Sequence, residues 1–490
     1  MAYKDLRDFM KTLEKHGEMQ RIPIEVDWNL EMGAIARRCN EMGAPAPFAE
    51  KVKGYPSGHR LMAGVLSGSK VNGRWAPYRR TALAFGMDPD TPPQELVEAY
   101  IEAGKNPIKP IEVSTGPVKE NIIVGDDVDL FKLPAPVVHG GDGGRYISTW
   151  HACIHQDPDS GWVNWGMYRS MIVDKNKLAG LLIPYQHGPM ILYQRYEARG
   201  KAMPFAIAIG GDPVVAFIAS SYLPAYVNEA DVAGGIRKEP IELVKCETND
   251  LMVPATSEIV IEGEIRPHER VEEGPFGEFT GFRTTERGGR PLHRIKAITH
   301  RNNPILTMSC MGMGCDEYAA LVSVTLSGEM LQILRQNGIP VRGVCVHPWG
   351  NTLSTIVSTK VPYANVAHQI SSMIWGSKAG VYVHWIIVVD ENVDPWNLED
   401  VFHAVVFQCN PQDGIHVYKR TLGMTLDPFL TPHDRAYGLG KSALLDATFP
   451  WEWEMKPIRV EIDNPQIYPE HIQQKVKGLW VKEYGYKEKY

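Results

Sequence analysis

Two glutamates in the segment EEGPFGE, residues 272–278, could carry acid–base chemistry. Glu273 and Glu278 lie on either side of a Gly-Pro-Phe-Gly turn, and Glu272 precedes the first of them. A proline and two glycines define the backbone of such a turn, so the two carboxylates would be held at set positions. Phe276 is expected to fold inward, and apolar surroundings raise the pKa of a carboxyl group toward neutral pH. The alternative is a surface turn whose three acids are solvated.

An arginine in WVNWGMYRSM, residues 162–171, could complete this site. Arg169 follows Asn164 by a few positions, among aromatic and apolar residues where a strand would otherwise bury only hydrophobic side chains. If Arg169 approaches the turn, its charge would keep one glutamate ionised while the other takes up and releases a proton. Paired acids with an arginine are typical of an acid–base site.

Further polar residues in the same third of the chain could hold a divalent metal. They are Asn164, His187 in the loop IPYQHG, and Glu229 in the segment SSYLPAYVNEAD. Oxygen ligands with one imidazole suit Mn²⁺ or Mg²⁺, whereas Zn²⁺ sites favour cysteine and several histidines. With Arg169 and Lys378, these residues could hold a phosphorylated cofactor through its metal. Each residue alone also has a structural interpretation: a core histidine, an Asn cap and a solvated Glu.

Other short motifs add little. The sequence has no HExxH, Walker A or GxSxG pattern, and GGDGG, residues 140–144, could be either an anion-binding nest or a flexible turn.

The composition indicates an ordinary globular protein. Of 490 residues, 44% are hydrophobic and 22% charged, and the net charge of -7 does not suggest a nucleic-acid or anionic-membrane partner. The charged first fifteen residues do not resemble a signal peptide, and no window approaches the roughly 20 apolar residues of a membrane helix. Seven cysteines without a CxxC pair favour reduced thiols in a cytoplasmic protein.

The elements that must position these residues differ along the chain. Leu6, Phe9, Met10 and Leu13 predict a short amphipathic helix, and a second helix should begin after a Thr91 cap and end at Gly104. Residues 104–117 are rich in Pro and Gly and indicate a domain boundary. From about 120 to 300, short β-branched runs between turn signals predict an antiparallel, barrel-like domain. The strand SEIVIEGEI, residues 257–265, leads toward the acidic turn, so the turn should lie near a strand end.

Beyond residue 300 the pattern becomes α/β. We expect a helix over 317–336, a buried strand over 381–390 and a helix capped by Asn397. A last helix carries Ile472, Val476, Leu479 and Trp480 on one face. That face could dock on a partner subunit or pack on its own domain.

Taken together, these motifs resemble the UbiD family of prenylated-FMN-dependent decarboxylases, nearer its aromatic and ferulate-type members. The similarity runs over nearly the whole chain, through DLRDFMKTLE, YIST, NWGMYR, IPYQH, SS…NE, EGPFGE, HRNNPI, KAG and VVDENVD. It implies an α+β, UbiD-like fold with a central split β-barrel that binds the cofactor. We therefore expect an N-terminal α/β segment (1–112), the prenylated-FMN-binding barrel (113–305), a C-terminal α/β oligomerisation domain (306–455) and a helical tail (456–490).

The resemblance implies a carboxy-lyase that reversibly and non-oxidatively decarboxylates an aromatic or heteroaromatic acid through a covalent prenylated-FMN adduct. Arg169, Glu273 and Glu278 match the family's catalytic residues, with Glu278 as proton donor and the Glu273–Arg169 pair in support. Glu272 gains no role and is expected to be solvated. Asn164, His187 and Glu229 match ligands of Mn²⁺ (or Mg²⁺). A K⁺ ion would share Glu229 and be held partly by the backbone around Trp165, Ala219, Ser220 and Tyr222.

The resemblance also implies two larger sets of lining residues. Matching the cofactor site are Thr149, Asn164, Gly166, Met167, Tyr168, Arg169, Gln186, His187, Ser220, Ser221 and Lys378, with Lys378 at the phosphate. Matching the substrate pocket are Phe279, Val322, Val381, Tyr382, His384, Met424 and Leu426. Tyr382 and His384 depart from the smaller or more apolar residues of cinnamate-type members, and the KAG segment departs from the phenolic-acid members. The departures leave open a heteroaromatic, fused-ring or thioester-linked aromatic acid.

The implied partners are a small aromatic acid, CO₂, a flavin prenyltransferase that supplies the cofactor, and further copies of the chain in a dimer or larger oligomer. No nucleic-acid or membrane partner is expected. Two alternatives are a flavin-dependent oxidoreductase on the same barrel and a non-catalytic subunit for cofactor maturation. The complete set of Arg169, Glu273, Glu278 and metal ligands disfavours the second alternative.

Overall fold

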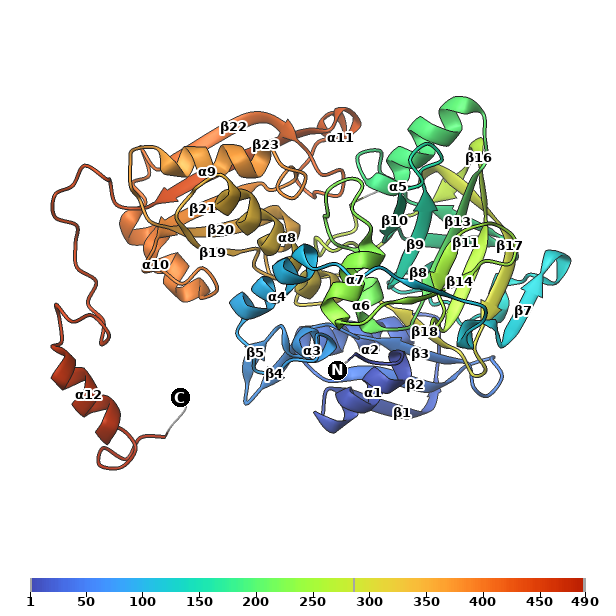
Figure 1. Cartoon of the computed structure of the whole chain (residues 1–490), viewed down its shortest axis with the longest axis horizontal. Coiled ribbons are helices and arrows are strands. Elements are labelled where there is room, and N and C mark those ends of the chain that lie inside the picture. The colour runs from blue at the N-terminus through green and yellow to red at the C-terminus, as the bar shows by residue number, and fades with distance from the viewer. Residues whose placement is uncertain (1, 285–286, 488–490) are drawn as a thin grey trace.

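A nine-stranded antiparallel sheet forms the centre of the computed structural model, which describes residues 2–284 and 287–487. The sheet curls into a half-open barrel on the right of Figure 1. Its order is β10-β9-β13-β16-β17-β12-β11-β8, with β7 added at β17. The strands are β7 (Asn121–Val124), β8 (Tyr146–Ser148), β9 (His151–Gln156), β10 (Val163–Gly166), β11 (Ser170–Asp174), β12 (Lys177–Gly180), β13 (Met203–Ile209), β16 (Ile259–Glu273) and β17 (Gly288–His300). The predicted antiparallel, barrel-like middle of the chain is confirmed.

Strand β16 carries the acidic turn. It continues past the predicted end at residue 265 to Glu273, with a register shift between Ile265 and Arg270 in its pairing with β17. Ile259, Ile261 and Ile265 are buried as predicted, but Val260 and Glu262 between them are buried as well, so both faces of the strand are covered there. The turn therefore begins at the strand's last residue, as expected from the sequence.

A smaller sheet, β1-β2-β3-β18, forms the lower part of Figure 1. Its strands are β1 (Met19–Val26), β2 (Ala46–Val52), β3 (Arg60–Ala63) and β18 (Ile305–Met308), and the chain around it forms α1 (Leu6–Lys15), α2 (Glu31–Met42), β4 (Ser69–Val71), β5 (Arg74–Ala76), α3 (Arg79–Ala84) and α4 (Pro93–Lys105). The predicted apolar face of α1 is buried. The division of the chain into four segments stays a prediction, and its boundary at 305/306 falls inside β18.

The start of α4 differs from the sequence prediction. Pro92, not Thr91, is the N-cap residue, and the helix continues through Gly104 to Lys105. Thr91 is used by the preceding turn, where its backbone N–H and its hydroxyl both donate to the carbonyl of Asp88. The cap prediction for Thr91 was therefore wrong.

The C-terminal part contains a five-stranded sheet, β19-β20-β21-β23-β22, at the upper left of Figure 1. Its elements are α8 (Glu317–Gln336), β19 (Val341–Cys345), β20 (Ser354–Thr359), α9 (Val366–Trp375), β21 (Trp385–Asp390), α10 (Leu398–Gln408), β22 (Ile415–Leu422), α11 (Pro432–Tyr437) and β23 (Leu439–Ala447). Helix α8 spans the predicted residues, and Asn397 caps α10 through N–H groups of the first turn. The strand predicted over 381–390 begins only at Trp385, and residues 381–384 belong to the preceding loop.

Short elements connect the barrel to the rest of the molecule. They are α5 (His187–Met190), η4 (Ile191–Tyr196), η5 (Glu197–Arg199), α6 (Pro213–Ala219), α7 (Glu229–Arg237), η1 (Pro117–Lys119), η2 (Gly125–Asp127), η3 (Leu130–Lys132), η6 (Asn351–Leu353) and the sheet of β6 (Ile111–Val113), β14 (Glu242–Lys245) and β15 (Met252–Pro254). Helix α8 lies between the C-terminal sheet and the other two layers (Figure 1), and most of its side chains are buried. It therefore joins the layers that surround the site.

The C-terminal tail runs away from this body and ends in α12 (Glu470–Leu479), which stands apart in Figure 1. On its predicted apolar face, Ile472, Val476 and Leu479 are half-buried and Trp480 is exposed. Among the described residues, no helix combines the length and the apolar character needed to cross a membrane.

Candidate active site

The three glutamates of the acidic turn differ in their exposure to solvent. Glu273 and Glu278 are both buried, whereas the side chain of Glu272 is 73% exposed. Gly274 has a φ of 88°, a conformation that side chains disfavour, and Phe276 is buried beneath the turn. The predictions that Phe276 folds inward and that Glu272 is solvated are confirmed.

Arg169 links the two buried glutamates. It lies between β10 and β11, and its Nε and Nη2 donate to Glu273 Oε1 and Oε2 at 2.9 and 3.1 Å. Its Nη1 pairs with Glu278 Oε1. The hydroxyl of Tyr146 donates to Glu273 Oε1 at 2.7 Å. Glu273 therefore accepts three hydrogen bonds, whereas Glu278 pairs with only one arm of the guanidinium.

A neighbouring segment fixes the turn from behind. The backbone N–H of Gly143 donates to the carbonyl of Pro275 at 2.8 Å, and Asp142 Oδ1 accepts from the N–H of Gly277 at 3.0 Å. The other oxygen of Asp142, Oδ2, accepts from the backbone N–H of His139 at 2.8 Å and lies 3.2 Å from its ring Nδ1. The GGDGG motif thus braces the residues next to Glu278, and the anion-nest interpretation stays a prediction.

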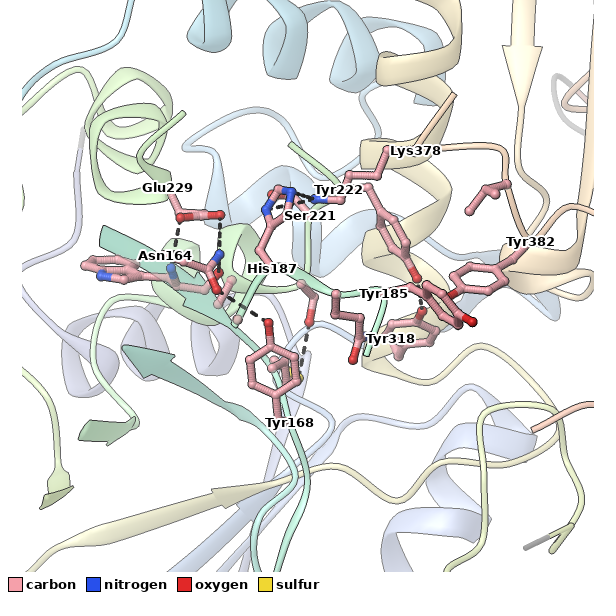
Figure 2. A pocket seen from close by; sticks show the side chains of 17 residues that line it. Asn164, Tyr168, Tyr185, His187, Ser221, Tyr222, Glu229, Tyr318, Lys378 and Tyr382 are labelled. Atoms are coloured by element: carbon pink, nitrogen blue, oxygen red, sulfur yellow. Dashed lines mark hydrogen bonds between the residues drawn. The ribbon is translucent and has the colours of Figure 1, made fainter. Parts of the chain in front are cut away.

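The predicted metal ligands meet at the other end of the site. Glu229, the first residue of α7, accepts from Asn164 Nδ2 at 3.0 Å and from the N–H of Trp165 at 2.9 Å. His187 lies at the start of α5, and Figure 2 shows its ring turned toward the same space. Within residues 2–284 and 287–487, no three His, Cys, Asp or Glu side chains gather around a common metal position. A metal here would take the Asn164 amide as its third protein ligand.

The charges at this end fit a metal and a phosphate. Burial, and then the charge of Lys378, lower the pKa of His187 to about 3, so its imidazole is neutral and able to bind a metal. Burial raises the pKa of Glu229 to about 7 and lowers that of Lys378 to about 8. Lys378 Nζ lies 2.9 Å from His187 Nε2 and donates to the carbonyl of Leu223 at 2.7 Å. A phosphate group bound here could pair with the ammonium group of Lys378.

Two adjoining cavities, of about 100 and 110 Å³, contain most of the predicted residues. The first is lined by every predicted metal and K⁺ residue, by Lys378 and by Gly166, Met167, Tyr168, Gln186, Ser221, Val381 and Tyr382. The second is lined by Thr149, Arg169, Glu278, Phe279, Met424 and Leu426. Both share Met167, Tyr168, Gln186, Ser220, Tyr222 and Tyr318. The predicted phosphate end and the predicted catalytic end therefore form one continuous site.

The predicted substrate residues divide into two groups. Phe279, Tyr382, Met424 and Leu426 form one buried apolar cluster, against which Val381 packs. Val322 on α8 instead belongs to the main hydrophobic core and lines neither cavity. His384 is buried and its Nε2 pairs with Asp427 Oδ2 at 2.5 Å behind the cluster. Neither Val322 nor His384 lines the two cavities, and their place in the substrate pocket stays a prediction.

Several lining residues were not predicted from the sequence. Met311 and Tyr318 contact the apolar cluster, and the Tyr318 hydroxyl lies 3.1 Å from that of Tyr222. Asp142 and His139 support the acidic turn. The GGDGG motif was a visible signal for Asp142, but nothing in the local pattern around Tyr318 distinguishes it from the other residues of α8.

Comparison with known proteins agrees with this arrangement. Three family models of 3-octaprenyl-4-hydroxybenzoate carboxy-lyase match in turn: the N-terminal domain over residues 10–100, the Rift-related domain over 109–314 and the C-terminal domain over 319–447. A pyrrole-2-carboxylic acid decarboxylase from Pseudomonas aeruginosa is 32% identical, over 98% of both chains. The chain belongs to the UbiD family. The family's three-domain architecture and its mixed helices and sheets are those described above.

Solved structures of this family share the whole fold. The vanillic acid decarboxylase of Sedimentibacter hydroxybenzoicus in its closed form matches with a TM-score of 0.86 and 31% identity, covering 98% of this chain and 99% of that one. An evolved dimeric form of the UbiD-class enzyme HmfF from Pelotomaculum thermopropionicum, in complex with prFMN, matches with a TM-score of 0.79 and 29% identity, covering 93% and 97%. These UbiD relatives favour a decarboxylase over the alternative of a flavin oxidoreductase.

Proposed function

We propose that this UbiD-family chain reversibly and non-oxidatively decarboxylates an aromatic or heteroaromatic carboxylic acid. The observation that carries the proposal is Arg169 held between Glu273 and Glu278 at the end of a site that continues to Asn164, His187, Glu229 and Lys378. Family membership and relatives named as decarboxylases support it.

The two glutamates would have different tasks. Glu273 does not line the described cavities, and Arg169 and Tyr146 hold it as the ionised partner of the guanidinium. Glu278 does line the cavity and makes fewer contacts, so it can take up and release a proton there. Arg169 would orient the substrate carboxylate, and Glu278 would protonate the ring carbon after CO₂ leaves.

The cofactor would be prenylated FMN, as in the HmfF complex. When bound, it supplies the electron sink that an aromatic carbanion lacks. We propose that Asn164, His187 and Glu229 hold Mn²⁺ or Mg²⁺ and that Lys378 contacts the phosphate. A K⁺ ion would bind near Trp165, Ala219, Ser220 and Tyr222 and share Glu229. The neutral imidazole of His187 and the burial of Lys378 support this assignment.

The substrate would lie against the apolar cluster of Phe279, Tyr382, Met424 and Leu426. Apolar walls with a few hydroxyl groups suit a flat aromatic acid. The relatives named for pyrrole-2-carboxylic and vanillic acids support a single-ring acid.

The test is co-expression with a flavin prenyltransferase, the proposed supplier of the cofactor. The purified protein should contain prenylated FMN by mass spectrometry and should release CO₂ from at least one acid in an aromatic and heteroaromatic panel. Glu278→Gln should keep the cofactor but lose CO₂ release by about 100-fold or more, because the proton donor is absent. Glu272→Gln is the matched control and should retain activity. Full turnover by Glu278→Gln would contradict the proposed role.

We further propose that the protein acts in the cytoplasm as a dimer or larger oligomer. The side chains of Phe402 and Phe407 on α10 are 70% and 71% exposed, and α12 stands apart from the main body in Figure 1. Light scattering on the full chain would test the proposed association, and a monomer at micromolar concentration would contradict it.

A further inference from the structure

A row of four polar side chains leads from the cavities into the protein. The hydroxyl oxygens of Tyr222 and Tyr318 are 3.1 Å apart, Tyr318 Oη lies 3.1 Å from Thr352 Oγ1, and Thr352 Oγ1 lies 3.2 Å from Asn351 Oδ1. Figure 2 shows Tyr222, Tyr318 and Tyr382 near one another among the residues that line the first cavity. Both tyrosines line both cavities, whereas Asn351 and Thr352 are buried behind them.

Asn351 sets the direction of the hydrogen bonds. Its Oδ1 accepts from the backbone N–H of Thr352 at 3.0 Å, so this atom is the amide oxygen and carries no proton. The only proton available between Oδ1 and the Thr352 hydroxyl is therefore the hydroxyl's own. If Thr352 donated elsewhere, two buried oxygens would face each other at 3.2 Å without a proton, which is unfavourable.

The direction of the other two hydrogen bonds follows from the donation by Thr352. Because Thr352 donates to Asn351, its oxygen accepts from Tyr318, and Tyr318 in turn accepts from Tyr222. Burial raises the pKa of both tyrosines, so each phenol keeps its single proton. Both protons are then used within the row. Toward the cavity, the two phenol oxygens offer lone pairs that accept hydrogen bonds.

We propose that Tyr222 and Tyr318 select substrates whose ring carries a hydrogen-bond donor, such as an azole N–H or a phenol O–H. A ring of the same shape that carries only a hydrogen-bond acceptor cannot form a hydrogen bond with these oxygens. We therefore expect such an acid to bind more weakly. The position is suitable, because Arg169 and Glu278 line the same cavity and the Phe279 and Tyr318 ring centroids are 5.2 Å apart. This inference rests on the proposed function, since it assigns the class of substrate at the same site.

Isosteric pairs of acids test the preference on the cofactor-loaded enzyme. Suitable pairs are pyrrole-2-carboxylate with furan-2-carboxylate, indole-2-carboxylate with benzofuran-2-carboxylate, and 4-hydroxybenzoate with 4-fluorobenzoate. Where the wild-type enzyme decarboxylates a pair, the acid whose ring carries the N–H or O–H should have a kcat/KM about tenfold or more above that of the other acid. A wild type that treats both members of each pair equally would overturn the inference.

Three variants separate hydrogen bonding from shape. Tyr318→Phe removes one acceptor and should bring the ratio within a pair close to one. Thr352→Val keeps both phenols but removes the group that fixes their direction, so the freed Tyr318 proton can serve an acceptor ring and the ratio should also fall. Tyr185→Phe removes a cavity hydroxyl outside the row and should leave the ratio unchanged, whatever its effect on rate. A ratio unaffected by both Tyr318→Phe and Thr352→Val would overturn the inference.

Calorimetric binding of the same acids distinguishes the two proposals. If no acid is decarboxylated, the proposed function fails, but tighter binding of the donor member, lost in Tyr318→Phe, would still support the hydrogen-bond preference. If acids are decarboxylated without a donor preference in rate or binding, the proposed function stands and this inference fails.

Discussion

Replacement of Asp142 by asparagine should show how strongly the GGDGG motif holds the acidic turn. The carboxylate of Asp142 is fully buried and accepts from the N–H of His139 at 2.8 Å and the N–H of Gly277 at 3.0 Å. Asparagine can keep only one of these bonds. Its NH₂ group takes the place of the second acceptor and faces an N–H donor, so the backbone beside Glu278 loses an anchor.

The expected effect follows from one buried N–H left without a partner, which costs about 1–3 kcal/mol. If that energy is lost from the positioning of Glu278 in the transition state, kcat should fall by about 5- to 150-fold. The assay is CO₂ release by the cofactor-loaded protein under saturating acid, with cofactor content measured by absorbance. KM should change less than kcat, because Asp142 does not line the described cavities.

The matched control is Asp129→Asn. Asp129 also accepts a backbone N–H, that of Phe131 at 2.9 Å, but at the start of η3. One amide oxygen can preserve this single bond, so the control should keep the wild-type kcat. The reasoning would be refuted if Asp142→Asn retained the wild-type kcat with full cofactor content, or if the control lost as much activity.

Three further predictions concern stability and local fit. Arg169→Met leaves the buried Glu273 and Glu278 without their cation and should lower the free energy of unfolding by about 3–5 kcal/mol in urea titrations, and an unchanged midpoint would contradict the buried ion pair. Gly143→Ala would place a Cβ 2.0 Å from the carbonyl oxygen of Gly274, so it should reduce kcat, whereas Gly73→Ala meets no neighbouring atom within 4 Å and should leave kcat unchanged despite its backbone strain. Burial raises the folded pKa of Asp316 to about 7, so between about pH 4 and 7 its unfolded form is ionised while its folded form stays protonated, and the contribution of Asp316 to stability falls as pH rises. The stability of Asp316→Asn relative to wild type should therefore increase with pH across this window, and parallel pH profiles in urea titrations would exclude the effect.

The local patterns of the sequence determined much of the secondary structure and the types of residue at the site. The apolar face of α1, the span of α8 and the Asn397 cap each depend on residues within a few turns of one another, and such short-range rules need no knowledge of the fold. The acidic turn at the end of β16 followed from the same kind of pattern. The family motifs also brought together residues from distant segments, but only by resemblance.

Only the tertiary structure decided how these residues contact one another. Arg169 and Glu273 are 104 residues apart in sequence, and their pairing depends on how strands of the barrel are placed side by side. Packing likewise placed Val322 in the core, turned His384 toward Asp427 and brought Asp142 against the turn. The row from Asn351 to Tyr222 joins η6, α8 and the segment after α6. Its direction starts from a contact between two adjacent residues, Asn351 and Thr352, but the contacts of Tyr318 with Thr352 and with Tyr222 join segments that only the fold brings together.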